Sequence, residues 1–190
     1  MNNEFAPLNE MYEIMQDFQN PWFICGGWAI DLELGRKTRD HKDVDIGTFR
    51  EDQLELQTYL GDWSFFKVLP DSRDIVEWKE GEYLEKPIHE TRARKDSKEV
   101  EFLLNDSDET SWIYRRNDRV HFPKEKLIRY RDNLPYWAPE ISLLYKAKTV
   151  RPHDEEDFEA ILGELSSDAK MWLKEAIQDT HPGHQWISKL

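Results

Sequence analysis

Two short patterns in the first quarter of the chain contain residue types that can do chemistry. A double glycine, Gly26-Gly27, follows an apolar run at residues 22–25, and Asp43 and Asp45 come shortly after it. Residues 43–47 alternate between polar and apolar, so we expect a strand in which both aspartates point to one face. Two neighbouring carboxylates repel each other unless a cation lies between them, and Mg²⁺ commonly takes one or two carboxylates together with substrate phosphate oxygens. The pair therefore predicts a Mg²⁺ site for phosphoryl-type transfer.

The double glycine predicts where the phosphates of a nucleotide would bind. Phosphate oxygens approach backbone N–H groups closely only where no side chain intrudes. The N-terminus of a following helix adds free donors and a favourable dipole. Each pattern alone is also typical of plain structure, a tight turn or an exposed strand face, but the two in this order are much more specific.

Local patterns predict the elements that position these residues. A helix is expected over residues 7–18, a buried strand over 22–25, and a helix that starts at Trp28 and ends at Gly35. The remaining expected elements are a helix over 51–60, strands over 64–69, 75–78, 87–94 and 98–104, weaker strands over 112–115 and 127–130, and helices over 140–148, 154–165 and from 167 onwards.

The order of a double glycine, a helix and an Asp-x-Asp strand resembles the polymerase-β-like nucleotidyltransferase superfamily. Residues 20–50 are similar to aminoglycoside 2″-adenylyltransferases and lincosamide nucleotidyltransferases, and a weaker likeness continues through 135–140, 143–148 and 154–158. The resemblance implies an α+β fold, with a mixed, mostly antiparallel sheet, flanking helices and a small C-terminal helical subdomain. The residues that carry it are Gly26, Gly27, Trp28, Ala29, Ile30, Asp31, Leu32, Gly35, Arg36, Thr38, Arg39, His41, Asp43 and Asp45.

The resemblance also implies a third carboxylate on a neighbouring strand, used as a metal ligand or as the base for an acceptor hydroxyl. Our candidate is Glu101, which lies between apolar neighbours, and Glu99 on the same strand face is the runner-up. Burial would raise the pKa of Glu101 towards the range useful for a base, whereas a nearby metal would lower it. Related enzymes often have Asp here, so the sequence leaves open whether Glu101 binds metal or only takes the proton.

Residues in the loop before the aspartates are candidates for nucleotide binding. Arg39 suits phosphate through its forked donors. His41 could contact phosphate or orient a metal-binding aspartate, and either residue could instead only pack the loop. For Asp31 we favour a structural role, capping Arg39 or stabilising the loop.

Two lysines near the start of the helical part could also reach the triphosphate. Lys146 and Lys148 are two residues apart on an expected helix, so we expect only one of them to face the cleft, and Lys146 is preferred. Basic runs at 92–95 and 115–119 could serve nucleotide recognition but are usually solvated faces, and His181 and His184 are expected to lie in a tail.

Composition excludes several classes of protein. The chain has 190 residues, with 38% hydrophobic and 13% aromatic residues, enough for a packed core. Its net charge of −13 speaks against a nucleic-acid binder and favours a cationic small molecule or divalent metals as partners. The single cysteine, Cys25, permits no intrachain disulfide, and neither a signal peptide nor an apolar membrane span is evident. We therefore expect a cytoplasmic protein without membrane partners, of unspecified oligomeric state.

Taken together, these patterns predict a catalytic domain over residues 1–135 and a helical subdomain over 136–190, with the substrates in the cleft between them. The resemblance implies Mg²⁺-dependent transfer of a nucleoside monophosphate (NMP) from a nucleoside triphosphate (NTP) to a hydroxyl of a small acceptor, such as an aminoglycoside or lincosamide. Alternatives are a toxin-like nucleotidyltransferase acting on tRNA or protein, a non-catalytic nucleotide-binding protein on this fold, and a plain metal-binding domain.

Overall fold

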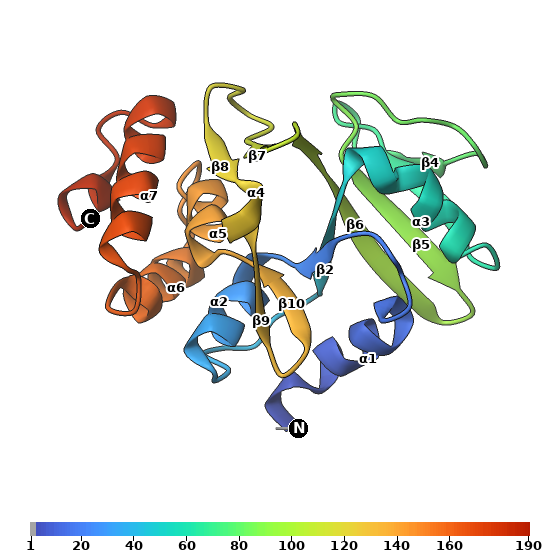
Figure 1. Ribbon diagram of the computed structural model, residues 1–190, viewed down its shortest axis with the longest axis horizontal. Helices are drawn as coiled ribbons and strands as arrows, with labels where there is room; N and C mark the ends of the chain where they lie inside the picture. Colours follow the sequence, from blue (N-terminus) through green and yellow to red (C-terminus); the bar gives the residue numbers. More distant parts are fainter. Residues whose placement is uncertain (1–2) are drawn as a thin grey trace.

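A mixed sheet organises the part of the chain that the computed structural model describes, residues 3–190 (Figure 1). Its main path has the order β4-β3-β5-β6-β2-β1-β10-β9, and β7 pairs with β6 and β8. Only the β1–β10 and β2–β6 pairs are parallel within the described residues, so the sheet is mostly antiparallel and the fold is α+β, as expected. The strands are β1 (Trp22–Ile24), β2 (Asp45–Phe49), β3 (Ser64–Val68), β4 (Ile75–Glu77), β5 (Glu90–Lys95), β6 (Lys98–Ser107), β7 (Ser111–Ile113), β8 (His121–Pro123), β9 (Ile128–Arg131) and β10 (Leu134–Trp137).

Helices flank the sheet and form most of the C-terminal third. Figure 1 shows α5, α6 and α7 gathered at one end of the molecule, and α3 with β4 and β5 at the other. No helix in residues 3–190 is both long and apolar enough to cross a membrane. The helices are η1 (Asn3–Phe5), α1 (Ala6–Met15), α2 (Gly26–Leu34), η2 (Arg50–Asp52), α3 (Gln53–Tyr59), α4 (Lys124–Leu127), α5 (Pro139–Lys146), α6 (Pro152–Leu162), α7 (Ser167–Thr180) and η3 (Gln185–Ser188).

The unit β1–α2–β2 forms as expected, with two corrections at its ends. Helix α2 begins at Gly26, ahead of the expected start at Trp28, so the glycines form its first turn. It ends at Leu34 and is capped by Gly35, whose φ of 71° is a left-handed conformation that glycine adopts without strain. Strand β2 begins at Asp45, and the prediction that Asp43 also lies in the strand was wrong. The Trp28 indole Nε1 donates to the Asp43 carbonyl at 3.1 Å, which ties this carbonyl to α2 instead of a neighbouring strand.

Most other predicted strands are present with shifted ends, but β8 and β10 were not expected. Strand β10 contains Pro135, which lacks an N–H for a sheet and therefore argued against a strand. It nevertheless lies inside the sheet, parallel to β1 and antiparallel to β9. The expected domain boundary between residues 135 and 136 falls within this strand.

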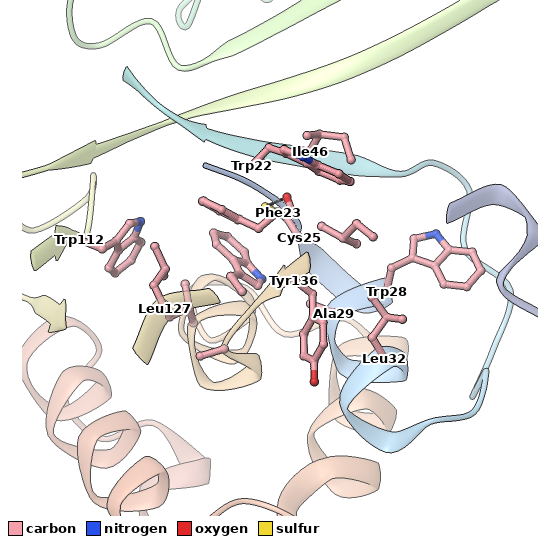
Figure 2. Packing of buried hydrophobic residues seen from close by; sticks show 14 of the residues in the cluster. Trp22, Phe23, Cys25, Trp28, Ala29, Leu32, Ile46, Trp112, Leu127 and Tyr136 are labelled. Carbon is pink, nitrogen blue, oxygen red and sulfur yellow. Dashed lines mark hydrogen bonds between the residues drawn. The ribbon is translucent and has the colours of Figure 1, made fainter. Parts of the chain in front are cut away.

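The core lies where the sheet meets the helices. Figure 2 shows side chains of β1, β2, β10 and α2 meeting in one cluster, among them Phe23, Ile46, Tyr136 and Ala29. At the C-terminal end, the rings of Phe158 and Trp186 stack with centroids 4.2 Å apart. Burial of each large apolar side chain stabilises the fold by about 1.5–3 kcal/mol, and this packing fixes the first turn of α2 against the start of β2.

Candidate functional site

A cleft of about 900 Å³ opens beside the first turn of α2. Every expected site residue except Glu101 lines it. Those that do are Gly26, Gly27, Arg39, His41, Asp43, Asp45 and Lys146.

The two glycines let other groups approach the first turn of α2 closely. Gly26 has a φ of +67°, and a Cβ added there would lie 3.3 Å from Oδ2 of Asp45. A Cβ on Gly27 would meet the Arg39 guanidinium at 2.5 Å and the His41 ring at 2.6 Å. Because α2 begins here, its free N–H groups and positive dipole end belong to the cleft wall, which suits an anion.

Asp45 and Glu101 are neighbours across the sheet. Parallel strands β2 and β6 place Asp45 opposite Glu101 in register. Burial, and then the charge of Asp43, raise the pKa of Asp45 to about 6. Burial, and then the charge of Asp45, raise the pKa of Glu101 to about 7. These carboxylates repel one another and resist ionisation, so a bound cation would be favoured here.

Glu90 is a fourth carboxylate that sequence reasoning missed. It is buried on β5, lines the cleft, and its charge contributes to the raised pKa values of both Asp45 and Glu101. Arg92, two residues further along the strand, lies 3.3 Å from Glu90 and 3.3 Å from Glu101. The alternation of Glu90 and Arg92 around Thr91 was the available signal, because residues two apart share a strand face. We call Asp43, Asp45, Glu90 and Glu101 the carboxylate cluster.

Glu99, the runner-up for the third carboxylate, lies elsewhere. It pairs with Arg94 and with Arg92, and its side chain is 40% exposed. The hydrogen bond from Arg94 lowers the pKa of Glu99. Glu99 lies opposite Arg94 near the start of β6, ahead of the register that joins β6 to β2. The geometry therefore favours Glu101 over Glu99.

The chemistry of the carboxylate cluster fits Mg²⁺, although its side chains do not form a closed cage. Among residues 3–190, no three His, Cys, Asp or Glu side chains converge closely enough to hold a metal by themselves. Mg²⁺ usually keeps several waters and takes only one or two carboxylates, with phosphate oxygens completing the shell. Oxygen donors that repel each other beside the N-terminus of α2 are compatible with that requirement.

The loop before β2 is held by two buried aspartates. Asp31 of α2 accepts hydrogen bonds from the Thr38 backbone N–H at 3.1 Å and the Thr38 hydroxyl at 2.6 Å. Its other oxygen lies 2.6 Å from Nε2 of His41, whose ring lies 4.3 Å from the ring of Trp28. Asp31 thus stabilises the loop, as expected, but through Thr38 and His41. Arg39 instead donates to both oxygens of Asp157 in α6, each at 2.8 Å.

Lys146 joins the same ionic network from α5. Its ammonium lies 2.7 Å from Asp154 and 2.9 Å from Asp157, and its side chain is 9% exposed. Burial opposes the ionisation of Asp154, but hydrogen bonds from Arg151 and Lys146 outweigh it and hold its pKa well below the usual range. We call Arg39, Lys146, Arg151, Asp154 and Asp157 the loop–α6 network. It fixes two of the expected phosphate-binding cations in place.

Lys148 also lines the cleft, so the prediction that only one of the two lysines could face it was wrong. Helix α5 ends at Lys146, and helical spacing therefore does not govern Lys148. Arg115 and Arg116 line the cleft as well, and their guanidiniums lie 5.5 and 5.0 Å from the ring centroid of Tyr145.

Comparison with known proteins agrees with this architecture. The model of the aminoglycoside-2″-adenylyltransferase family matches residues 7–127. A 2″-aminoglycoside nucleotidyltransferase of Escherichia coli, and one of Klebsiella pneumoniae, are each 48% identical over 40 residues. That match covers 21% of this chain and 23% of each relative, so the aligned segment is about a quarter of their length.

Solved structures of antibiotic-modifying enzymes share the fold. The crystal structure of ANT(2″)-Ia with adenylyl-2″-tobramycin has a TM-score of 0.58 and 16% identity, covering 91% of this chain and 98% of that one. Lincomycin-bound LnuA, a lincosamide antibiotic adenylyltransferase, has a TM-score of 0.52 and 14% identity, covering 85% and 96%. At these identities the likeness shows the fold alone, whereas the family match extends over more than half of the chain. The chain belongs to the aminoglycoside-2″-adenylyltransferase family.

Proposed function

We propose that this protein is a Mg²⁺-dependent nucleotidyltransferase that moves NMP from an NTP to a hydroxyl of a small acceptor and releases pyrophosphate. The observation that carries the proposal is the carboxylate cluster beside the first turn of α2. It places mutually repelling oxygen donors next to an anion-binding helix end, which is the requirement of a metal–triphosphate complex. Residues 1–135 would supply this chemistry, and residues 136–190 would close the other side of the cleft.

Each cleft residue has a role in this scheme. The phosphates would lie against Gly26 and Gly27, which line the cleft at the first turn of α2. Asp157 holds the cationic side chains of Arg39 and Lys146 in place, and Asp31 holds His41 at the wall of the site. Their preset positions would lower the entropic cost of binding a triphosphate.

Asp43 and Asp45, together with Glu101, would hold Mg²⁺. When bound, the metal neutralises phosphate charge and helps to align the reacting oxygens. Glu101 would take the proton of the acceptor hydroxyl. Its pKa of about 7 is that of the metal-free site, and bound Mg²⁺ would lower the pKa and keep the carboxylate ionised and able to accept a proton. The acceptor oxygen then bonds to the α-phosphorus as the bond to the leaving oxygen breaks, and pyrophosphate departs.

The first acceptors to test are an aminoglycoside and a lincosamide, because structures of the same fold hold adenylyl-2″-tobramycin and lincomycin. The hydroxyl of either compound could serve as the nucleophile in the scheme above.

Calorimetric titration of each of the four NTPs, with Mg²⁺ and then with EDTA, tests the proposal. We expect metal-dependent binding of at least one NTP, and pyrophosphate release once an acceptor is supplied. Binding without release in the presence of acceptors, including tRNA, would favour a non-catalytic nucleotide-binding protein. Metal binding by the folded protein with no NTP binding would leave only a metal-binding domain and would refute the proposal.

A further inference from the structure

A buried chain of hydrogen bonds runs from the end of β10 through α5 to the first turn of the neighbouring helix α2 (Figure 1). The indole Nε1 of Trp137 donates to the hydroxyl oxygen of Ser142 at 2.6 Å, and this hydroxyl donates to the carbonyl oxygen of Gly26 at 2.8 Å. Ser142 is 1% exposed and Trp137 is 3% exposed, and both line the cleft. Neither residue has a role in the proposed scheme, although the chain ends on one of the two glycines assigned to the phosphates.

The direction of this chain follows from the chemistry of its members. An indole N–H can only donate, so the hydroxyl oxygen of Ser142 accepts there, and its single proton is left for the Gly26 carbonyl. The indole itself is held in place, because the Trp137 ring stacks on Tyr145 with centroids 5.6 Å apart and on Phe23 of β1 with centroids 6.0 Å apart. Ser142 therefore directs its proton at one backbone oxygen of α2.

The Gly26 carbonyl sets the orientation of the peptide group that it shares with Gly27. This peptide is trans and planar, so its carbonyl and its N–H point in opposite directions. With the carbonyl held against Ser142 of α5, the Gly27 N–H points away from α5. As the second residue of α2, Gly27 has an N–H without an intrahelical acceptor. Free backbone donors of this type bind phosphate oxygens at the starts of helices.

The other close neighbours of the two glycines belong to the cleft. A Cβ on Gly26 would approach Asp45. A Cβ on Gly27 would approach Arg39 and His41. All three of these neighbours line the cleft. The glycine peptide therefore lies between α5, which holds its carbonyl, and the residues proposed to bind metal and phosphate.

We propose that Ser142 is a positioning residue for nucleotide binding: its hydroxyl, held by Trp137, fixes the Gly26–Gly27 peptide so that the Gly27 N–H donates to a phosphate oxygen of the NTP. This inference rests on the proposed function, because it takes the phosphates to lie against the two glycines. Hydrogen bonds in series polarise one another, and here every donor points the same way, towards a negatively charged phosphate. The Ser142 hydroxyl therefore strengthens the donor that the phosphate meets, as well as orienting it.

Ser142→Ala removes the hydroxyl, and calorimetry with Mg²⁺ and the tightest-binding NTP measures the consequence. We expect the Kd to rise about tenfold, because a hydrogen bond to a charged group is misaligned and weakened. In steady-state kinetics the KM for NTP should rise, whereas kcat should change by about threefold or less, since this contact is already made in the ground state. Unchanged NTP affinity in the folded variant would overturn the positioning role.

Thr48→Val is the matched control for the loss of a buried hydroxyl. Thr48 on β2 is 0% exposed, and its hydroxyl donates to the Pro21 carbonyl at 3.2 Å, away from the residues that line the cleft. Both substitutions should lower the urea midpoint, but Thr48→Val should leave NTP affinity unchanged. An equal loss of affinity in the two variants would mean that general loosening of the core weakens binding, and it would overturn the inference.

Trp137→Phe is a milder variant that keeps an aromatic ring in the core. It removes the N–H that holds the Ser142 hydroxyl, so the hydroxyl can turn away from Gly26. The Kd for NTP should rise about threefold, to a value between those of the parent and Ser142→Ala. If Ser142→Ala does not fold, a folded Trp137→Phe variant with the affinity of the parent would refute the proposal.

Tripolyphosphate with Mg²⁺ shows which part of the nucleotide depends on Ser142, because this probe lacks a base and a sugar. Ser142→Ala should weaken the binding of tripolyphosphate and of NTP by the same factor. A loss of affinity for NTP alone would assign Ser142 to the base or the sugar and would overturn the phosphate role.

Nuclear magnetic resonance of the glycine peptide reports on both ends of the chain. Without nucleotide, Ser142→Ala should shift the Gly26 carbonyl ¹³C resonance, and in the parent Mg²⁺-tripolyphosphate should shift the Gly27 amide resonance. A Gly27 amide that does not respond while the probe binds would overturn the inference and leave the proposed function intact. If the parent binds neither tripolyphosphate nor any NTP, the proposed function fails and the inference fails with it, so the two failures are distinguishable.

Discussion

Two charged groups each contribute residues to the same cleft, but their charges are paired to different degrees. In the loop–α6 network each carboxylate meets cations at close range, and Asp157, only 1% exposed, holds both Arg39 and Lys146. In the carboxylate cluster, Glu90 pairs with Arg73 and Arg92, and Glu101 pairs with Arg92. Within residues 3–190, Asp43 and Asp45 have no ion-pair partner, and the charges of Asp43 and Glu90 oppose the ionisation of Asp45. The pKa values differ accordingly, being lowered for Asp154 and Asp157 and raised for Asp45 and Glu101.

The difference in charge pairing distinguishes residues that stabilise the fold from residues proposed to bind metal and substrate. Paired charges stabilise the native state without a ligand, and removing one partner leaves a buried charge uncompensated. Repelling charges cost stability until a cation arrives, so their retention in the fold points to binding. The loop–α6 network should therefore matter most for stability, and the carboxylate cluster for activity.

The largest expected effect is on transfer by Asp45→Asn. Removing a metal-ligating charge should lower kcat/KM by about 10³-fold, since a bound metal stabilises the transition state by several kcal/mol. The same variant, free of metal at pH 8, should unfold at an equal or higher urea concentration than the parent, because a repelled charge is gone. Asp74→Asn, at an exposed position outside the cleft, is the control. Full activity of Asp45→Asn would contradict the proposed mechanism.

Asp157→Ala, unlike Asp45→Asn, should destabilise the folded state. It would leave Arg39 and Lys146 without their shared partner and lower the free energy of unfolding by about 3 kcal/mol. Urea denaturation followed by tryptophan fluorescence measures this change. A loss below about 0.5 kcal/mol, typical of surface substitutions, would mean that solvent already compensates these charges.

Glu101→Gln and Glu99→Gln form a matched pair on one strand. Loss of the base at Glu101 should reduce kcat by about 10²-fold or more with little change in the affinity for NTP. Glu99 pairs with Arg92 and Arg94 at the exposed edge, so Glu99→Gln should stay within about twofold. A reversal of these outcomes in steady-state kinetics would make Glu99 the third carboxylate.

The smallest expected effect is the dependence of metal binding on pH. Ligand carboxylates must lose their protons, so Mn²⁺ affinity measured by calorimetry should rise about fourfold between pH 5.5 and 7.5 through Asp45, whose pKa is about 6, and further through Glu101 if it is also a ligand. In the metal-free protein, ionisation of these same carboxylates instead lowers the free energy of unfolding. These raised pKa values mean that the folded state binds protons more tightly than the unfolded chain, so their contribution falls as pH rises from about 4 through 7. Metal affinity that did not change over this pH range would argue against ligation by Asp45.

Short-range features of the fold could be predicted from the sequence. The β1–α2–β2 unit depends on contiguous apolar runs and on glycines at its turns, so the local sequence pattern was sufficient to predict it. Strand β10 could not be predicted, because Pro135 is unfavourable in isolation and the strand is stabilised by pairing with β1 and β9, distant in the sequence. The start of β2 was predicted too early, at Asp43, because the sequence pattern does not reveal the hydrogen bond that Trp28 donates to the Asp43 carbonyl.

The sequence by itself determined the family and placed the double glycine and the two aspartates beside one another as candidate site residues, because these lie within one continuous segment whose spacing is set by covalent geometry. Only the tertiary structure decided that Glu101 lies opposite Asp45, that Glu90 joins them, and that Arg39 and Lys146 share Asp157, since these contacts join residues far apart in the chain.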